Sequence, residues 1–186
     1  MKMKKAICIL FSVLMALSVL SMTASAVATP LEAGSSMASA ALIPNFGVDY
    51  VSSLSKGGEV DWFKFTTLAE DAYYTVGVRN NNCGSWLDYH LYDVNMKQLA
   101  WNGIADNSSK SSNLKLEVNT VYYLRIIHES KGIGNYEISV NYKEDTVPNS
   151  MDRAVPVALN QTSVQSLDGA GDVDWFKFTS ASISAD

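Results

Sequence analysis

The stretch Asp61-Trp62-Phe63-Lys64-Phe65-Thr66 occurs twice in this chain of 186 residues. It returns as Asp174-Trp175-Phe176-Lys177-Phe178-Thr179, a shift of 174 − 61 = 113 residues. The match also extends upstream, where Val51, Ser53, Leu54, Gly58 and Val60 reappear as Val164, Ser166, Leu167, Gly171 and Val173. This distance exceeds the roughly 20–50 residues of a solenoid repeat and suits one small domain. The sequence therefore predicts one full domain followed by the opening of a second.

The first residues have the pattern of an export signal. Lys2, Lys4 and Lys5 precede an apolar run over residues 6–20, and Ala24-Ser25-Ala26 has the small-residue spacing of a cleavage site. The run is shorter than the roughly 20 residues that a membrane-spanning helix needs. We therefore expect a cleaved signal peptide over residues 1–26, no stable membrane anchor, and a secreted, extracellular protein.

The composition excludes some partners. The formal net charge is −5, and loss of the three signal-peptide lysines gives −5 − 3 = −8. Nucleic-acid binding needs basic patches, so we expect no nucleic-acid partner. Cys8 lies in the signal, which leaves Cys83 alone and predicts no intramolecular disulfide.

Beyond the signal, short segments alternate apolar and polar residues and are separated by turn residues. Tyr74, Val76 and Val78, for example, alternate with polar or small neighbours. About eight such segments predict an all-β fold, an antiparallel β-sandwich with a jelly-roll-like arrangement. We predict a linker over residues 27–34, the sandwich domain over 35–142, a second linker over 143–148 and a truncated second copy over 149–186. Residues 102–113 are predicted to form a polar loop.

Alternation also assigns faces within the repeated hexapeptide. Asp61, Phe63 and Phe65 share one face, and Trp62 and Lys64 share the other. Two phenylalanines indicate that their face packs inward. Asp61 is expected to hold a turn by accepting backbone N–H bonds, as Asp often does. Trp62 is left as the candidate surface contact.

Several ordered motifs together resemble one family. They are Asn149-Ser150-Met151-Asp152-Arg153-Ala154, Gly171-Asp172-Val173-Asp174-Trp175-Phe176-Lys177-Phe178 with its first copy Gly58–Phe65, the strand Leu87–Asp93, and the closing segments Tyr122–Ile126 and Gly134–Val140. This series resembles the bacterial pre-peptidase C-terminal domain family, to which the collagen-binding modules of clostridial collagenases are related. The resemblance covers residues 35–142 in full and 149–180 as a partial copy.

The resemblance implies a secreted β-sandwich module, of the kind appended to exported proteases and other hydrolases. The function it implies is non-catalytic binding or targeting to an extracellular polymer, either a collagen-like protein or a polysaccharide. The alternative is an accessory-domain fragment of a secreted peptidase or other hydrolase whose catalytic part is absent from this chain.

The motifs of common enzymes are missing from the sequence. His90 and His128 lack a Ser or Cys motif at a recognisable spacing, and there is no HExxH, paired-Cys zinc pattern or phosphate-binding glycine loop. We therefore expect no enzyme activity. Whether two carboxylates converge, as in a glycosidase, depends on the fold and stays open at this point.

The resemblance also implies a calcium site. In the collagen-binding relatives, calcium lies between an acidic linker and the Asp-rich turn before the Trp/Tyr-Phe strand. The matching residues here are Glu144, Asp145, Asn149, Asp152, Asp172 and Asp174. The first copy offers only Glu32, Glu59 and Asp61, so calcium is expected in the second copy and not in the first. The alternative is that these aspartates only accept turn N–H bonds.

Aromatic residues at outward positions form the candidate ligand-binding face. By alternation they are Trp62, Tyr73, Tyr92, Trp101 and Tyr123, of which Trp62, Tyr92 and Trp101 are the chosen contacts. Flat aromatic rings stack on sugars or proline-rich strands, and exposed aromatic clusters mark binding surfaces. The alternative is packing under loops. The strand Val173–Thr179 is also a candidate for self-association, since unpaired strand edges accept partners.

Overall fold

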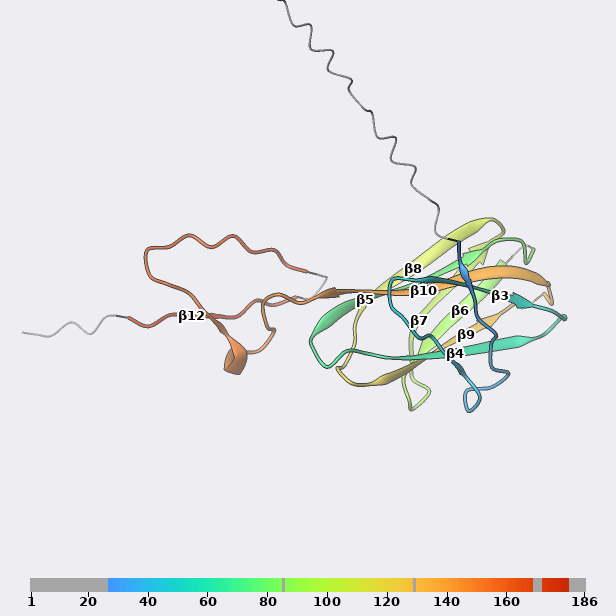
Figure 1. Ribbon diagram of the computed structural model, residues 1–186, viewed down its shortest axis with the longest axis horizontal. Coiled ribbons are helices and arrows are strands. Elements are labelled where there is room, and N and C mark those ends of the chain that lie inside the picture. Colours follow the sequence, from blue (N-terminus) through green and yellow to red (C-terminus); the bar gives the residue numbers. More distant parts are fainter. Residues whose placement is uncertain (1–26, 85, 129, 169–171, 181–186) are drawn as a thin grey trace, which may run out of the picture.

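The computed structural model describes residues 27–84, 86–128, 130–168 and 172–180. The predicted signal peptide lies outside this part of the chain. Two five-stranded sheets form a β-sandwich, which confirms the predicted fold class (Figure 1). One sheet has the order β1 (Thr29–Pro30), β3 (Asp49–Leu54), β10 (Gly134–Glu144), β5 (Ala72–Asn80), β8 (Ser108–Lys115). The other has the order β2 (Ala41–Leu42), β4 (Val60–Thr66), β9 (Val121–Ile127), β6 (Trp86–Tyr92), β7 (Gln98–Ala105).

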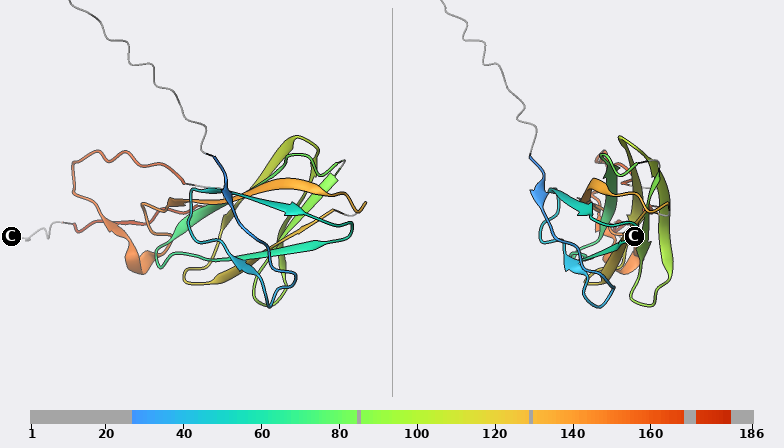
Figure 2. Two further views of the ribbon diagram at one scale, coloured as in Figure 1. Left: turned by 45° about the vertical axis from the view of Figure 1, so that its right-hand side comes forward. Right: turned by 90° about the vertical axis from the view of Figure 1, so that its right-hand side faces the viewer.

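The chain crosses repeatedly from one sheet to the other, as in a jelly roll. From β3 to β10, only β6 and β7 are consecutive strands that pair within one sheet. The long strands pair antiparallel, while the two-residue strands β1 and β2 pair parallel with β3 and β4 at the sheet edges. Figure 2 shows the two sheets packed face to face. This arrangement gives one inner face to each sheet, which must be apolar.

The core lies between these inner faces and follows the predicted alternation. Phe63 and Phe65 of β4 are fully buried, and the Phe65 ring stacks on Tyr122 of β9 with centroids 5.9 Å apart. The opposite sheet contributes Tyr74, Val76 and other alternate residues of β5 and β10. Each fully buried large side chain contributes about 1.5–3 kcal/mol of hydrophobic stabilisation.

The prediction of a polar loop over residues 102–113 is wrong. This stretch contains the end of β7 and most of β8, joined by a tight turn in which Asn107 has a φ of 56°. Asp-Asn sequences tolerate such a left-handed backbone. β8 is an edge strand that pairs only with β5 among the described residues. Its ladder bonds are made by the backbone, so solvent-facing serines do not prevent pairing.

The predicted linkers are partly strands. Thr29–Pro30 forms β1, and Gly34 bridges Trp62 of β4, so residues 29–34 line the edges of both sheets. Leu31 and Ala33 pack against the core. At the other end, β10 continues to Glu144, inside the stretch predicted as the second linker. The alternation signal missed the first of these segments because two-residue strands are too short to show a period.

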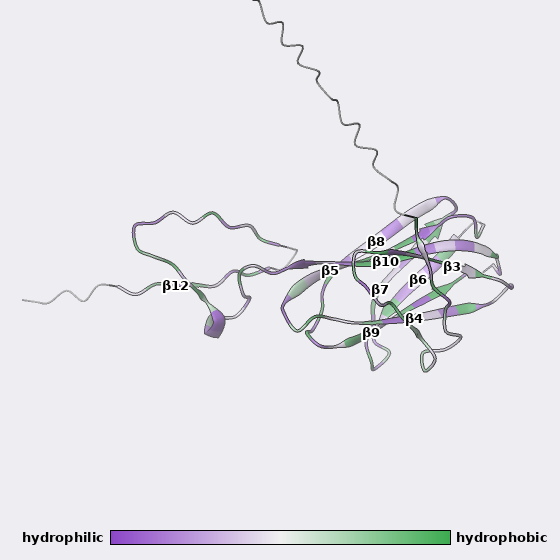
Figure 3. Cartoon of the chain, viewed as in Figure 1, coloured by the Kyte–Doolittle hydropathy of each residue, from purple (hydrophilic) through white to green (hydrophobic). Residues whose placement is uncertain are grey.

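The second copy forms an open segment beyond the end of β10 (Figures 1 and 2). It contains one 3-10 turn, η1 (Met151–Arg153), and a parallel two-stranded pair of β11 (Val155–Pro156) and β12 (Phe176–Lys177). Hydrophobic residues occur along this segment as well as in the sandwich (Figure 3). Many of them are solvent-exposed, including Leu167 and Phe178, each with 68% of its surface accessible. Within the described part of the chain, no helix has the length and apolar character to cross a membrane.

Candidate binding sites

Asp61 does not hold a turn, contrary to the sequence prediction. It is buried on the inner face of β4, and its Oδ2 accepts a hydrogen bond from the Tyr136 hydroxyl of β10. Burial raises the pKa of Asp61 to about 6. The turn is held instead by Glu59, whose Oε2 accepts the backbone N–H groups of Ser55 at 2.5 Å and Lys56 at 3.2 Å. Asp61 is therefore committed to the core of the first copy.

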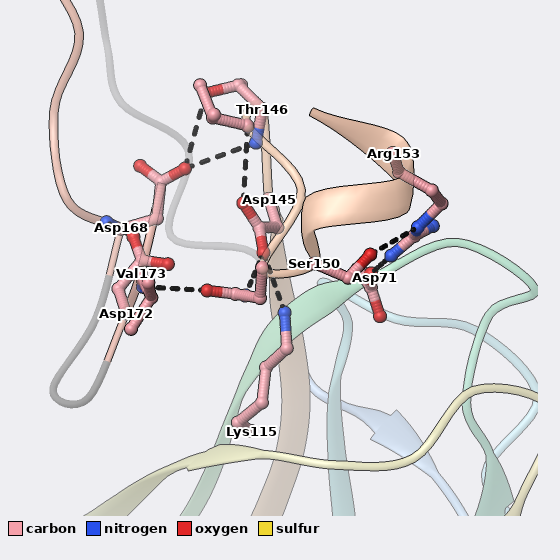
Figure 4. Close-up of polar contacts among 11 residues, drawn as sticks. Asp71, Lys115, Asp145, Thr146, Ser150, Arg153, Asp168, Asp172 and Val173 are labelled. Atoms are coloured by element: carbon pink, nitrogen blue, oxygen red, sulfur yellow. Dashed lines mark hydrogen bonds and ion pairs between the residues drawn. The ribbon is translucent and has the colours of Figure 1, made fainter. Parts of the chain in front are cut away.

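Three aspartates meet where the second copy leaves the sandwich. Asp145 follows β10, and Asp172 and Asp174 precede β12 (Figure 4 shows Asp145 and Asp172). Each offers a carboxylate oxygen, and these oxygens lie within 4.8 Å of one another. We call these three residues the acidic junction. The Oδ2 of Asp172 accepts the Asp168 backbone N–H, while its Oδ1 is buried and has no hydrogen-bond partner within the described residues.

Positive charges only partly balance the acidic junction. Lys115 Nζ lies 2.8 Å from Asp145 Oδ2, and Lys143 Nζ lies 2.6 Å from Asp168 Oδ1. Burial raises the pKa of Asp174, and the negative charges of Asp172, Asp145 and Asp168 raise it further. Burial and the neighbouring Asp172 also raise the pKa of the Tyr73 hydroxyl to about 12. The junction therefore concentrates negative charge that a bound cation would relieve.

The residues at the acidic junction fit a hard cation such as calcium. Three carboxylates converge, and the unpartnered Asp172 Oδ1 is one oxygen ready to bind it. Asn149 is nearby, but its amide group donates to Asp145 Oδ2 at 2.5 Å and its Oδ1 accepts the Val173 N–H at 2.7 Å. Two other predicted ligands, Glu144 and Asp152, are exposed and are not part of the converging group.

The first copy does not reproduce this group. The repeat shift of 113 residues places Glu32, Glu59 and Asp61 at the positions of Asp145, Asp172 and Asp174. Glu32 is exposed, Glu59 holds a turn, and Asp61 is bonded to a tyrosine. In the first copy, two of the three carboxylates are therefore committed to a turn and to the core, and the sequence predicted no calcium there.

A row of four rings crosses the outer face of the β2-β4-β9-β6-β7 sheet. The ring centroids of Trp62 in β4 and Tyr92 in β6 lie 5.9 Å apart. The Tyr92 ring stacks on that of His90, with a centroid distance of 6.0 Å and an interplanar angle of 9°. His90 in turn lies 6.4 Å from Trp101 of β7. We call these four residues the aromatic row. It joins all three of the contacts predicted from the sequence.

Exposure varies along the aromatic row. Trp62 is only 8% exposed, so the expectation that it forms a surface contact is wrong. Gly34 exchanges two backbone hydrogen bonds with Trp62, at 2.8 and 3.0 Å, and holds the N-terminal segment beside β4. Tyr92 is half-buried and Trp101 is 55% exposed. Tyr73, also expected outside, is buried in the other sheet with Lys115 Nζ 4.6 Å from its ring centroid. The accessible part of the row is its Trp101 end.

Sequence reasoning did not single out Trp86 or His90 as binding residues. Both share the outer face of β6 with Tyr92, and the period of two along Trp86, Asp88, His90 and Tyr92 was the available signal. Trp86 is 57% exposed. Trp86 follows directly after the polar stretch 80–85, so the start of this alternation was not recognised in the sequence.

The nucleophile candidates do not show catalytic geometry. Burial raises the pKa of the Cys83 thiol to about 11, which keeps it protonated. His128 is buried, and its Nδ1 accepts the Gly132 backbone N–H at 2.9 Å. Among the described residues, the carboxylates found to converge in a group of three are those of the acidic junction.

Comparison with known proteins gives only distant similarities. No family model and no curated protein matches the chain. Among solved structures, it is similar to the pre-peptidase C-terminal domain of a Bacillus anthracis collagenase, with 20% identity over 61% of this chain and 94% of that one and a TM-score of 0.42. It is also similar to PliG, a periplasmic inhibitor of g-type lysozyme from Aeromonas hydrophila, with 7% identity over 62% and 96% of the two chains and a TM-score of 0.41. These values do not assign the chain to a family.

Proposed function

We propose that this protein is a secreted, non-catalytic module that binds an extracellular polymer, either a polysaccharide or a collagen-like protein. The observation that carries the proposal is the aromatic row, which ends in the exposed Trp101 on one open sheet face. Exposed aromatic residues at the surface of a soluble domain mark binding sites, since they lose favourable burial unless a ligand covers them.

The row is preorganised for contact. His90 Nδ1 lies 2.9 Å from Gln98 Oε1, which fixes the imidazole between Tyr92 and Trp101. Tyr92 is supported in turn by the buried Trp62 ring. A ligand that covers Trp101 therefore meets rings whose rotamers are already restricted, which lowers the entropic cost of binding.

Calcium at the acidic junction is a further part of the proposal. A divalent cation between Asp145, Asp172 and Asp174 would neutralise their mutual repulsion and tie the second copy to the end of β10. The chain supplies these carboxylates from two segments, so binding would fix one segment relative to the other.

Co-sedimentation of the full chain with insoluble collagen, cellulose, chitin and peptidoglycan tests the proposed function. We expect retention on at least one polymer and a marked loss of retention in Trp101→Ala. Trp175→Ala is the matched control, since Trp175 is a partly exposed tryptophan in the second copy. Absence of retention on every polymer, together with unchanged tryptophan fluorescence, would contradict the proposal.

Self-association through the second copy is a second proposal. Among the described residues, β12 pairs only with the two-residue β11, and Phe178 nearby is largely exposed. Its free edge could add to a sheet of another molecule. Sedimentation equilibrium should then show a concentration-dependent dimer that disappears on deletion of residues 168–186. A monomer at all concentrations would rule this out.

A further inference from the structure

A cleft adjoins the exposed end of the aromatic row. It has a volume of about 520 Å³ and is lined by Trp86, Asp88, Trp101, Gly103, Lys110 and Ser130. This volume is within the roughly 300–1,000 Å³ of small-molecule sites. We call it the two-tryptophan cleft.

The strand register places the two indoles at opposite ends of the cleft. In the β6–β7 ladder, Trp86 is opposite Ala105, Asp88 is opposite Gly103, and His90 is opposite Trp101. The Asp88–Gly103 pair therefore lies between the two tryptophans. Both indoles are more than half exposed, Trp86 at 57% and Trp101 at 55%. Two large exposed rings on neighbouring strands form a pair of walls.

Gly103 forms the floor between them because it has no side chain. A Cβ at this position would lie 3.0 Å from Asp88 Oδ1 and 3.4 Å from Trp86 Cε3. One edge of the Trp86 ring thus lies close to the Gly103 backbone. A Cβ at this position would therefore crowd the Asp88 carboxylate and occupy part of the cleft floor.

Polar groups of three kinds complete the lining. Lys110 and Ser130 are exposed and offer an ammonium and a hydroxyl group to a ligand, while the Asp88 carboxylate is 7% exposed. A suitable ligand must therefore present apolar surface to the two indoles and several hydroxyl-type donors and acceptors around its rim. Hexopyranoses with equatorial substituents have this distribution, because their C–H groups face the ring planes and their hydroxyls point outward.

We propose that the two-tryptophan cleft binds a β-linked glycan of equatorially substituted hexopyranose units. This inference rests on the proposed polymer-binding function and specifies its ligand class and subsite. A proline-rich or collagen-like peptide also covers indoles, but it carries few side-chain donors and acceptors. Such a peptide would desolvate the exposed Lys110 and Ser130 without replacing their hydrogen bonds to water.

Isothermal titration calorimetry of the full chain with cellohexaose and chitohexaose tests the inference. Maltohexaose, which is α-linked, and a Pro-Pro-Gly repeat peptide are the comparison ligands. We expect one or both β-linked hexamers to bind, and Trp86→Ala and Trp101→Ala each to weaken binding by at least about tenfold. Gly103→Ala should weaken it too, since its Cβ would lie 3.0 Å from Asp88 Oδ1 and would occupy part of the cleft floor. Trp175→Ala should leave the affinity unchanged.

Circular dichroism and thermal unfolding of each variant show that the domain stays folded. If neither β-linked hexamer binds, or if binding survives both tryptophan substitutions, the cleft is not the glycan site. If the peptide binds instead and the same variants abolish this, the ligand class is wrong. In each of these outcomes, retention of the chain on an insoluble polymer would still support the proposed polymer-binding function. Absence of retention on every polymer would contradict both the polymer-binding function and the glycan site.

Discussion

The two copies of the hexapeptide share a sequence and a local backbone arrangement but differ in burial. Ala41–Leu42 pairs parallel with Phe63–Lys64 in the first copy, and Val155–Pro156 pairs in the same way with Phe176–Lys177 in the second. Phe63 and Phe65 are completely buried, whereas Phe176 and Phe178 are 38% and 68% exposed. Identical residues thus lie in a core in one place and on a surface in the other.

The difference comes from strands far away in the sequence. In the first copy, β4 also pairs with β9 over seven residues, and the opposite sheet covers its inner face through residues such as Tyr136. In the second copy, β12 pairs only with β11 among the described residues. The hexapeptide therefore specifies a strand with one apolar face, while non-local partners decide whether that face is buried.

Truncation of the same residue in each copy gives the largest expected contrast. Phe63→Ala removes a fully buried ring and should destabilise the domain by about 3–5 kcal/mol. Phe176→Ala should change stability by less than about 1 kcal/mol. Urea unfolding followed by circular dichroism measures both. If Phe63→Ala does not fold, Phe63→Leu provides the comparison, and equal effects at the two positions would contradict the account.

The aspartate that opens each copy should give a pH-dependent contrast. The folded-state pKa of Asp61 is raised from its usual 3.8 to about 6, so the folded domain binds this proton more tightly than the unfolded chain. Its contribution to stability is full below about pH 4 and is lost as the pH rises to about 6, a change on the order of 3 kcal/mol.

Asp61→Asn should abolish this dependence, because the amide oxygen can accept the Tyr136 hydroxyl and does not ionise. The difference in unfolding free energy between this variant and the unmodified protein should grow between about pH 4 and about pH 7. Asp174→Asn is the matched comparison and should show a smaller growth, since the pKa of Asp174 is also raised but by less. A constant difference for Asp61→Asn across this range would show that Asp61 is not protonated in the core.

Calcium should distinguish the second copy from the first. We expect calorimetry to detect calcium binding with a dissociation constant of about 10⁻⁴–10⁻³ M, typical of extracellular modules. Asp172→Asn should abolish it, since this change removes the buried, unpartnered carboxylate. Glu59→Gln changes the corresponding residue of the first copy and should leave calcium binding intact. Loss of calcium binding in Glu59→Gln but not in Asp172→Asn would place the calcium site in the first copy instead.

The contact between Arg153 and Asp71 should have the smallest effect. This ion pair links η1 to the residue before β5, and half of the Arg153 side chain is exposed. Exposed ion pairs contribute little to stability, so Arg153→Ala should leave urea unfolding of the sandwich unchanged. It should speed exchange of the Val155 amide, which donates to Trp175 O at 2.9 Å. Unaltered exchange would mean that other contacts hold the segment.

The sequence predicted the elements that show a clear period of two. The inner faces of β4, β5 and β9 are as expected, because alternation requires no knowledge of partners. It failed for the serine-rich β8, which is held by backbone bonds at a sheet edge. Alternation also missed the burial of Trp62, which depends on Gly34, and it placed Asp61 on the inward face but missed its hydrogen bond with Tyr136. The acidic junction was predicted in part, through Asp145, Asp172 and Asp174, but the sequence could not show that Glu144 and Asp152 lie outside it.

Hydrogen exchange of the two hexapeptides tests the central claim most directly. The amides of Phe63 and Phe65 should exchange only through global unfolding, since β4 lies between two paired strands. Those of Phe176 and Phe178 should exchange through local opening, many times faster. Mass spectrometry or NMR can follow both stretches in one sample. Equal protection of the two copies would contradict the conclusion that distant strands, and not the repeated sequence itself, make the first copy the folded binding unit.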